Sequence, residues 1–411
     1  MLKAMPKDSS FDEQMKELEQ ERKALSSVIR AMEEKNVFNF LSDEGLLPNY
    51  AFPEAGVSLK AILTRKKERV LASDTDDDGY ERVTYEYSRS SSSAISEFAP
   101  DNSFYVGGHQ LKIDQIDVNT SEPVDWRLCP NCNHAEPAST LHNTVACPVC
   151  GSNAWGDSGQ IRRMLKVRTV YSTQPYEASQ IGDESDDRSS KFYSKQMLVD
   201  VDEQHDIESG YQTTDGKLPF GYEFVRKATL REINFGESDN IGTRMKVAGR
   251  EDIRNGFRLC RFCGKVQPRS QQAKAKHTSI CKAAKKDFKD TFEECMFLYR
   301  EFVSEAIRIL IPATSMDTNR TKMESFSAAI MLGLKKHFGS VEHLRFTVMD
   351  APVQDAEYRK QYLVIYDSVP GGTGYLKELT VTPDSLMDIF DLSLQEFVRS
   401  KLNAARAMTA V

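Results

Sequence analysis

The chain has 411 residues, 40% hydrophobic and 28% charged, which is typical of a soluble protein with room for two or three domains. Its longest apolar runs, such as Ile307–Ile311, are far too short to cross a bilayer. The first residues lack the apolar core of a secretory signal, so we expect a cytoplasmic protein. A net charge of −7 excludes a surface that is basic throughout.

The spacing of apolar residues predicts one long helix at 11–41, followed by a middle region rich in strands. Gly107 and Gly108 are expected to form a hairpin turn between two of these strands. The predicted strands lie at 82–87, 102–118, 163–172 and 196–201, with two shorter segments within 222–235.

The last third of the chain is predicted to mix helices and strands. One helix is expected at 288–311, where Pro312 ends it, and another at 323–338, where Gly339 ends it. The other predicted elements are strands at 345–350 and 361–367, a Gly-rich turn with a helix at 369–379, and a terminal helix at 386–402.

These elements predict an α+β fold: a mixed, β-rich middle with zinc-ribbon insertions and an α/β C-terminal domain. We expect three regions. They are an N-terminal helix and linker at 1–60, a β-rich region at 61–250 and a C-terminal domain at 251–411. Seven of the eight cysteines fall into two clusters, one at 129–150 and one at 260–281.

The first cluster consists of two C-x-x-C pairs separated by fourteen residues. In a reducing cytosol this spacing holds metal more often than disulfides, and two such pairs are typical of a zinc ribbon. Gly151 supplies the positive φ that such a turn needs, while His134 and His142 are expected to be surface residues and not ligands. Four thiolates leave no open coordination position, so the site is predicted to be structural. The predicted ligands are Cys129, Cys132, Cys147 and Cys150.

The second cluster has the pattern C-x-x-C followed later by H-x-x-x-C. A histidine and a cysteine four residues apart on a helix share one face, which suits a single metal ion. The alternative is a set of ordinary buried thiols and a surface histidine. The remaining cysteine, Cys295, is expected to be a buried thiol on the 288–311 helix. The predicted ligands are Cys260, Cys263, His277 and Cys281, which would make a second Zn²⁺ site.

Basic residues concentrate around this second cluster. Between Arg254 and Lys289 there are eleven Lys or Arg against one acid, Asp287, a formal charge of +10, while the rest of the chain carries −17. A knuckle followed by a basic helix resembles a zinc finger, whose cations neutralise phosphates; the alternative is a solvated helix face. The predicted nucleic-acid contacts are Arg258, Arg261, Lys265, Lys274, Lys276, Lys282, Lys285 and Lys286.

A Gly-rich stretch begins at Asp367 and follows a predicted strand. It could cradle an anion at the start of a helix, although a tight packing turn is the favoured interpretation. The anion-binding alternative would use Gly371, Gly372, Thr373 and Gly374. No Walker A loop or other motor motif is present, so we expect no catalysis by this chain alone.

The segment VIYDSVPGGTGYLKEL is similar to the closing signature of the zinc-binding domain of MrfA-like helicases and DrmB-like proteins. The segments SFSAAIMLGLKKHFG, AISEFAPDNSFYVGGHQLKI and GLLPNYAFP resemble other parts of these large anti-phage helicases. The chain departs from the family pattern at Asp101, where the family has Gly.

The resemblance implies the C-terminal part of a superfamily 2, DEAD/DEAH-type, ATP-dependent helicase system used in DNA repair or phage defence. It implies zinc as the cofactor, with DNA or RNA and a helicase motor domain or subunit as partners. A second hypothesis is a protein-interaction scaffold with purely structural zinc and no DNA contact. A third is a nuclease, for which Asp367 is the candidate residue.

Overall fold

The computed structural model describes residues 56–66, 80–120, 123–140, 145–181, 191–213, 220–238, 243–269, 274–284, 291–311, 320–353 and 359–408. The helix predicted at 11–41 lies outside them. No helix among the described residues is both long enough and apolar enough to span a membrane.

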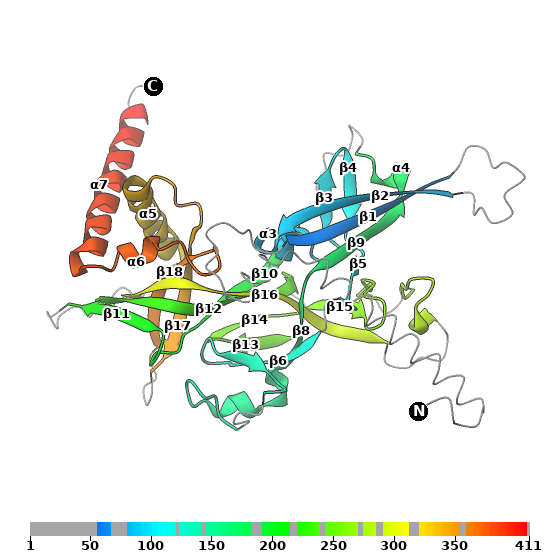
Figure 1. Ribbon diagram of the computed structural model, residues 1–411, viewed down its shortest axis with the longest axis horizontal. Helices are drawn as coiled ribbons and strands as arrows, with labels where there is room; N and C mark the ends of the chain where they lie inside the picture. The colour runs from blue at the N-terminus through cyan, green and yellow to red at the C-terminus, as the bar shows by residue number, and fades with distance from the viewer. Residues whose placement is uncertain are drawn as a thin grey trace, which may run out of the picture.

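The strand β16 (Phe292–Ile311) runs through the middle of the molecule and organises the larger sheet (Figure 1). The helix predicted at 288–311 is therefore wrong. In the N-terminal half of β16, the neighbouring residues Phe297 and Leu298 pack into two different apolar clusters. Farther along the strand, Phe302 and Ile307 also belong to two different clusters. A strand covered on both faces carries a nearly continuous apolar sequence in place of an alternating one, which hides its period.

The larger sheet contains ten strands among the described residues. Its main path runs β10 (Tyr193–Asp200), β12 (Gly221–Glu237), β16, β8 (Ile161–Lys166), β6 (Val124–Leu128) and β7 (Ala135–Pro137). Four more strands join this path: β11 (Ile207–Gln212) on β12, β15 (Phe257–Cys260) on β16, and β18 (Arg359–Asp367) on β16 with β17 (Leu344–Pro352) outside it. Most pairs are antiparallel, but β8 runs parallel to β16.

The two strand segments predicted at 222–235 form one strand, β12, whose register shifts between Val225 and Ala228. A bulge of this kind bends a long strand without ending it. Because β12 pairs with β16 along most of its length, strands from both sides of the predicted boundary at residue 250 belong to one sheet. The division at residues 60 and 250 stays a prediction.

A second, four-stranded sheet packs beside the first (Figure 1). Its strand order is β2 (Tyr80–Ser90), β1 (Gly56–Lys66), β9 (Thr169–Pro175) and β5 (Gln115–Ile116). The helices α3 (Ser91–Glu97) and α4 (Tyr176–Ser179) and the hairpin β3 (Ser103–Val106)–β4 (His109–Lys112) border it. Leu59, Leu63 and Val170 form an apolar core with Leu298 of β16, so the two sheets share one interior.

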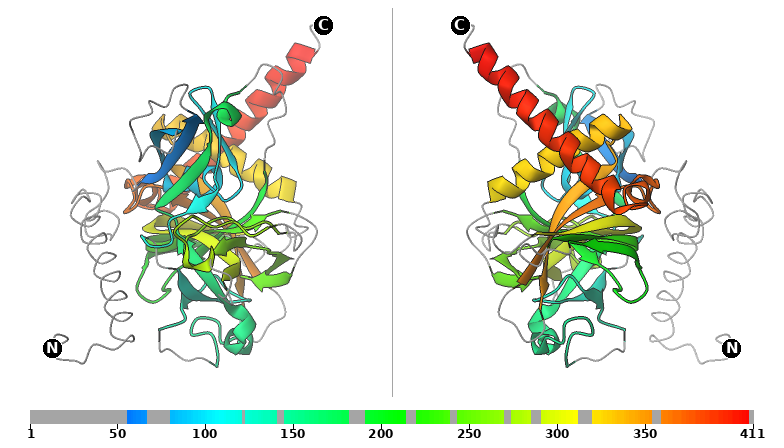
Figure 2. Two further views of the ribbon diagram at one scale, coloured as in Figure 1. Left: turned by 90° about the vertical axis from the view of Figure 1, so that its right-hand side faces the viewer. Right: turned by 90° about the vertical axis from the view of Figure 1, so that its left-hand side faces the viewer.

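Three helices cover one face of the β12–β16–β18 end of the large sheet, where α5 and α7 cross each other (Figure 2). They are α5 (Arg320–Phe338), α6 (Tyr375–Glu378) and α7 (Pro383–Met408). Ile330 and Leu334 of α5 pack with Ile389 of α7 and with Ile307 of β16. A separate hairpin joins β13 (Arg244–Val247) to β14 (Arg250–Ile253), and short 3-10 turns lie at Asn153–Gly156, Ser158–Gln160 and Lys282–Ala284.

The α+β class is confirmed, with a β-rich middle, two cysteine clusters and a C-terminal region that combines helices with strands. The helix predicted at 323–338 corresponds to α5, and Gly339 follows it with φ +81°. The hairpin turn at Gly107 and Gly108 is also present, and both glycines have positive φ.

Candidate metal centres

The four sulfurs of the first cluster meet at one point beside the end of β6. The Sγ atoms of Cys129 and Cys150 lie 3.6 Å apart, as do those of Cys132 and Cys147, and all four lie within 4.8 Å of one another. A tetrahedral zinc ion with Zn–S bonds of about 2.3 Å has S–S edges of about 3.8 Å. The four cysteines, none of them in a disulfide, therefore fit a tetrahedral metal ion.

The first knuckle of this cluster is fixed to the C-terminal half of the chain through its backbone carbonyls. The turn between β13 and β14 supplies two donors, and a side chain of β18 supplies a third. The bonds run from Ala248 N to Cys129 O (2.9 Å), from Gly249 N to Pro130 O (2.8 Å) and from Arg359 Nη2 to Asn131 O. Since these bonds join residues more than a hundred positions apart, the metal site ties distant segments together.

Trp155 is fully buried and closes the apolar side of the cluster. His134 lies close by, but its Nδ1 is 2.8 Å from a carboxylate oxygen of Asp200. The ring is thus engaged by Asp200 and does not belong to the metal group. Its side chain is only 17% exposed, so the expectation of a surface residue is corrected. His142, predicted in the same way, lies outside the described residues.

The second cluster forms at the end of β15. The Sγ of Cys281 lies 3.7 Å from the Sγ of Cys260 and 3.6 Å from the Nδ1 of His277. Together with Cys263 these ligand atoms all lie within 4.8 Å of one another. The arrangement is a Cys₃His group, which also fits a tetrahedral ion.

The second knuckle is docked on β5, from the other sheet. The side chain of Gln115 donates to the carbonyl of Cys263 at 2.8 Å, and the amide of Val266 donates to the carbonyl of Asp114 at 2.9 Å. Gly264 closes the knuckle with φ +67°, the left-handed conformation that glycine adopts without strain. Both metal centres therefore depend on contacts between segments that are distant in sequence.

The prediction that His277 and Cys281 share one face of a helix is wrong. Residues 274–281 form an irregular loop. Buried Gln267 holds this loop by accepting a hydrogen bond from the amide of Lys276 at 2.9 Å. The ring of His277 then stacks on Phe292 with 5.7 Å between ring centroids. The histidine reaches the metal position through these tertiary contacts.

Several of the basic residues predicted to contact nucleic acid are neutralised by the chain's own carboxylates. Three form ion pairs: Arg258 Nε with Glu294 at 2.7 Å, Arg261 Nε with Glu293 at 2.8 Å, and Lys265 with Asp114. In contrast, Lys274, Lys276 and Lys282 are exposed on the loop that carries His277 and Cys281. Lys285 and Lys286 lie outside the described residues.

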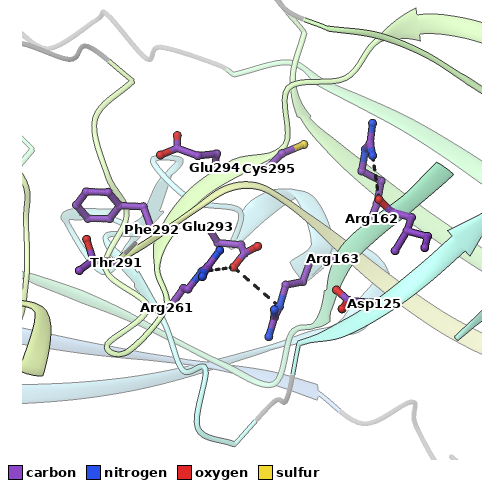
Figure 3. A pocket seen from close by; sticks show the side chains of 10 residues that line it. Asp125, Arg162, Arg163, Arg261, Thr291, Phe292, Glu293, Glu294 and Cys295 are labelled. Carbon is purple, nitrogen blue, oxygen red and sulfur yellow. Dashed lines mark hydrogen bonds and ion pairs between the residues drawn. The ribbon is translucent and has the colours of Figure 1, made fainter. Parts of the chain in front are cut away.

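A cavity of about 560 Å³ lies beside the second knuckle (Figure 3). Arg261 and Arg163 both point toward the carboxylate of Glu293 there, at 2.8 and 4.0 Å. Cys295 also lines this cavity; it is half-buried on β16, and burial raises the pKa of its thiol. Cys295 was expected to be a buried thiol on a helix, whereas it lies on a strand and is partly exposed.

The Gly-rich turn is filled by two carboxylates of the chain itself. Fully buried Asp367 accepts hydrogen bonds from the amides of Val369 and Thr373, each at 2.8 Å. Glu305 of β16 accepts one from the amide of Gly374 at 2.7 Å. The amides of Thr373 and Gly374, which the anion-binding alternative required, are therefore engaged, and the geometry is that of a packing turn.

Glu305 was not singled out by sequence, because a lone glutamate in an apolar run carries no signal of its role. Burial raises the pKa of this carboxyl above its ordinary value, and nearby Asp367 raises it further, while the backbone donors oppose the shift. A Cβ at residue 372 would lie 2.4 Å from its Cγ, so Gly372 makes room for Glu305. The role of Asp367 is likewise structural, since its carboxylate is buried and bonded to its own turn.

No protein-family model matches the chain, and no curated protein matches it. A solved structure described as "Crystal Structure of DUF1998 helicase MrfA bound to DNA" aligns with a TM-score of 0.34 and 10% identity. The alignment covers 82% of this chain but 29% of that helicase, so the chain spans less than a third of its length. A similarity this distant carries no argument about function.

Proposed function

We propose that this chain is a zinc-binding, nucleic-acid-binding accessory module of a DEAD/DEAH-type helicase system, active in DNA repair or phage defence. The helicase context rests on the resemblance of the segment Val364–Leu379 to the closing signature of MrfA-like zinc-binding domains. The nucleic-acid contact rests on one observation, the exposed lysines of the loop that carries His277 and Cys281.

Zinc is the metal that the donor sets favour. Four thiolates, or three thiolates and an imidazole, in a tetrahedron suit Zn²⁺ and leave no position for water or substrate. Both ions would therefore be structural. The first would hold β6 against the β13–β14 turn, and the second would hold the loop 274–281 against β15 and Phe292.

The loop's three lysines would neutralise backbone phosphates. Lys274 and Lys276 precede His277, and Lys282 follows Cys281, so all three lie within three residues of a ligand. Each phosphate neutralised on duplex DNA steepens the dependence of log K on log salt by about 0.9. The intact chain should thus bind duplex DNA with a slope that falls by up to about three when the three lysines are removed.

Fluorescence anisotropy with labelled duplex and single-stranded oligonucleotides, at about 50 to about 200 mM salt, tests this proposal. The variant Lys274→Ala/Lys276→Ala/Lys282→Ala should bind more weakly and with a shallower slope. The matched control replaces three exposed lysines elsewhere, Lys322, Lys335 and Lys360, and should bind like the wild type. Equal loss in both variants, or no binding by the wild type, would refute the nucleic-acid role.

The ion pairs of Arg258, Arg261 and Lys265 favour a second candidate, a scaffold with purely structural zinc. They neutralise three of the eleven basic residues between Arg254 and Lys289. Co-purification with a helicase motor subunit by a chain that binds neither duplex nor single strand would support this alternative.

A further inference from the structure

Four arginines are nine-tenths or more buried among the described residues, and three of them have a carboxylate partner. These pairs are Arg231 with Glu301, Arg300 with Glu232 and Arg308 with Glu223. The fourth, Arg254, is 4% exposed and makes no ion pair with any described residue. A buried cation normally has a partner because its desolvation is costly, so Arg254 is the exception in this fold.

The partners of Arg254 are all neutral. Its Nε donates to the carbonyl of Met245 at 3.2 Å, and its Nη2 donates to the side-chain oxygen of Gln196 at 2.8 Å. The guanidinium lies 3.8 Å from the ring centroid of Phe235. Its Nη1 is buried and has no hydrogen-bond acceptor among the described residues. Burial lowers the pKa of Arg254 to about 10, so the side chain still carries its charge at neutral pH.

Arg254 lines a cleft of about 960 Å³ between β10, β14, α5 and the β17–β18 hairpin. Two further buried polar atoms without a partner among the described residues belong to its lining residues, the hydroxyl of Tyr193 and the Oε1 of Gln361. Other buried polar atoms of this kind occur elsewhere among the described residues, but these three belong to the lining of one cleft, where a bound ligand would supply the missing partners.

The charges around the cleft define what it could bind. Arg250 lines the same cleft, and its charge lowers the pKa of Arg254, while the carboxylate of Asp252 raises it more. An anion near the two guanidinium groups would further stabilise both charges. Carboxylates also lie around the cleft, and several have partners of their own. Asp252 is bonded to Ser194, Asp350 to Gln361 and Glu251 to Arg244, and Glu324 of α5 also has a partner. They disfavour a long polyanion but leave room for one compact anionic group.

We propose that this cleft binds a small phosphate ester, with the phosphate against Arg250 and Arg254 and the polar remainder toward Tyr193 and Gln361. Two guanidinium groups that line one cleft favour a doubly charged phosphate over a carboxylate. The volume accommodates a molecule of mononucleotide size. This site is separate from the lysine loop of the proposed function and does not depend on it.

Isothermal titration calorimetry on the full, metal-loaded chain tests the inference with inorganic phosphate, adenosine monophosphate, adenosine and a single-stranded oligonucleotide. Phosphate and the monophosphate should bind saturably, and adenosine should not. Arg250→Ala, at an exposed position, should weaken the monophosphate about tenfold, the expected loss for one charge-assisted contact. Arg254→Met should abolish binding, with circular dichroism as the check on folding.

Absence of heat with both phosphate and the monophosphate would overturn the inference, as would binding that Arg250→Ala leaves unchanged. Binding of the oligonucleotide alone, sensitive to Arg250, would also overturn it and assign the cleft to a nucleic-acid strand. The variant lacking Lys274, Lys276 and Lys282 should bind the monophosphate normally, so failure of this inference is distinguishable from failure of the proposed function.

Discussion

The backbone amide of Ile116 donates a hydrogen bond to the carbonyl of Gly264, with 3.0 Å between nitrogen and oxygen. In addition, the carbonyl oxygen of Ile116 lies only 1.8 Å from the position that a Cβ on residue 264 would occupy. The second metal knuckle is thus pressed directly against β5, with a glycine at the contact. This contact links the metal site to the four-stranded sheet.

Replacing Gly264 by alanine should disrupt that site. The residue has φ +67°, which costs roughly 1–3 kcal/mol for a side chain, and the methyl would also collide with the backbone at Ile116. We expect a loss of unfolding free energy larger than the strain alone, together with loss of one metal ion per chain. Urea unfolding and elemental analysis measure the two effects.

Gly339→Ala provides the control for that substitution. Gly339 has φ +81°, but nothing lies within 4 Å of its Cβ position. The Gly339→Ala variant should lose about 1 kcal/mol of unfolding free energy and keep both of its metal ions. If both variants lose the same unfolding free energy, the close contact of Gly264 with Ile116 of β5 does not contribute to stability.

Glu232→Gln should strongly destabilise the large sheet. Its carboxylate lies 2.7 Å from the Nε of Arg300, whose side chain is only 6% exposed, so the substitution removes a negatively charged partner from a buried cation. Breaking a buried pair in this way typically costs about 3–5 kcal/mol. Glu97→Gln breaks the exposed pair with Arg89 and should cost at most about 1 kcal/mol. Similar denaturant midpoints for the two variants would show that the buried pair contributes little.

Glu305→Gln should change the pH dependence of stability. Burial raises the pKa of Glu305 in the folded state above its ordinary value near 4.5. The folded chain therefore holds this proton more tightly than the unfolded chain does. The stability that results is fully present below the unfolded pKa and is lost as pH rises through the folded pKa. Glutamine stays neutral, so the variant should gain stability relative to the wild type as pH rises from about 5 to about 8.

Urea unfolding of both proteins across that range, in buffer containing zinc, measures this difference. The comparison between the two proteins at each pH removes the effect of proton competition at the metal sites, which they share. A difference that stays constant across the range would contradict the raised pKa.

The cysteine clusters could be predicted from sequence because their chemistry is local. Each C-x-x-C pair brings two sulfurs together within one turn, and the glycine that follows each cluster's knuckle, Gly151 or Gly264, has the positive φ that such a turn needs. Asp101, where the resembled family has glycine, also has a positive φ of 62°. The conformation at this turn is the one that glycine favours, even though the residue differs.

The elements that were predicted wrongly depend on contacts between segments that are distant in the sequence. The β16 sequence contains four Glu, which favour helices over strands, but its strand-forming Phe and Ile residues and its pairing with β12, β18 and β8 override that local preference. The loop around His277 has its shape from Gln267 and Phe292, and no local pattern encodes those contacts. The charge of the basic segment was visible in the sequence, whereas the carboxylates that neutralise Arg258 and Arg261 became visible only when β16 was placed beside β15.

Elemental analysis of the protein, purified without chelators, tests most directly whether two zinc ions build this fold. The wild type should contain two zinc ions per chain, while Cys132→Ser and Cys263→Ser should each retain one, because each belongs to a different ligand group. X-ray absorption should find about 2.3 Å Zn–S distances in all three proteins. A wild type with no zinc, with iron in its place, or with zinc that neither substitution removes would contradict the account.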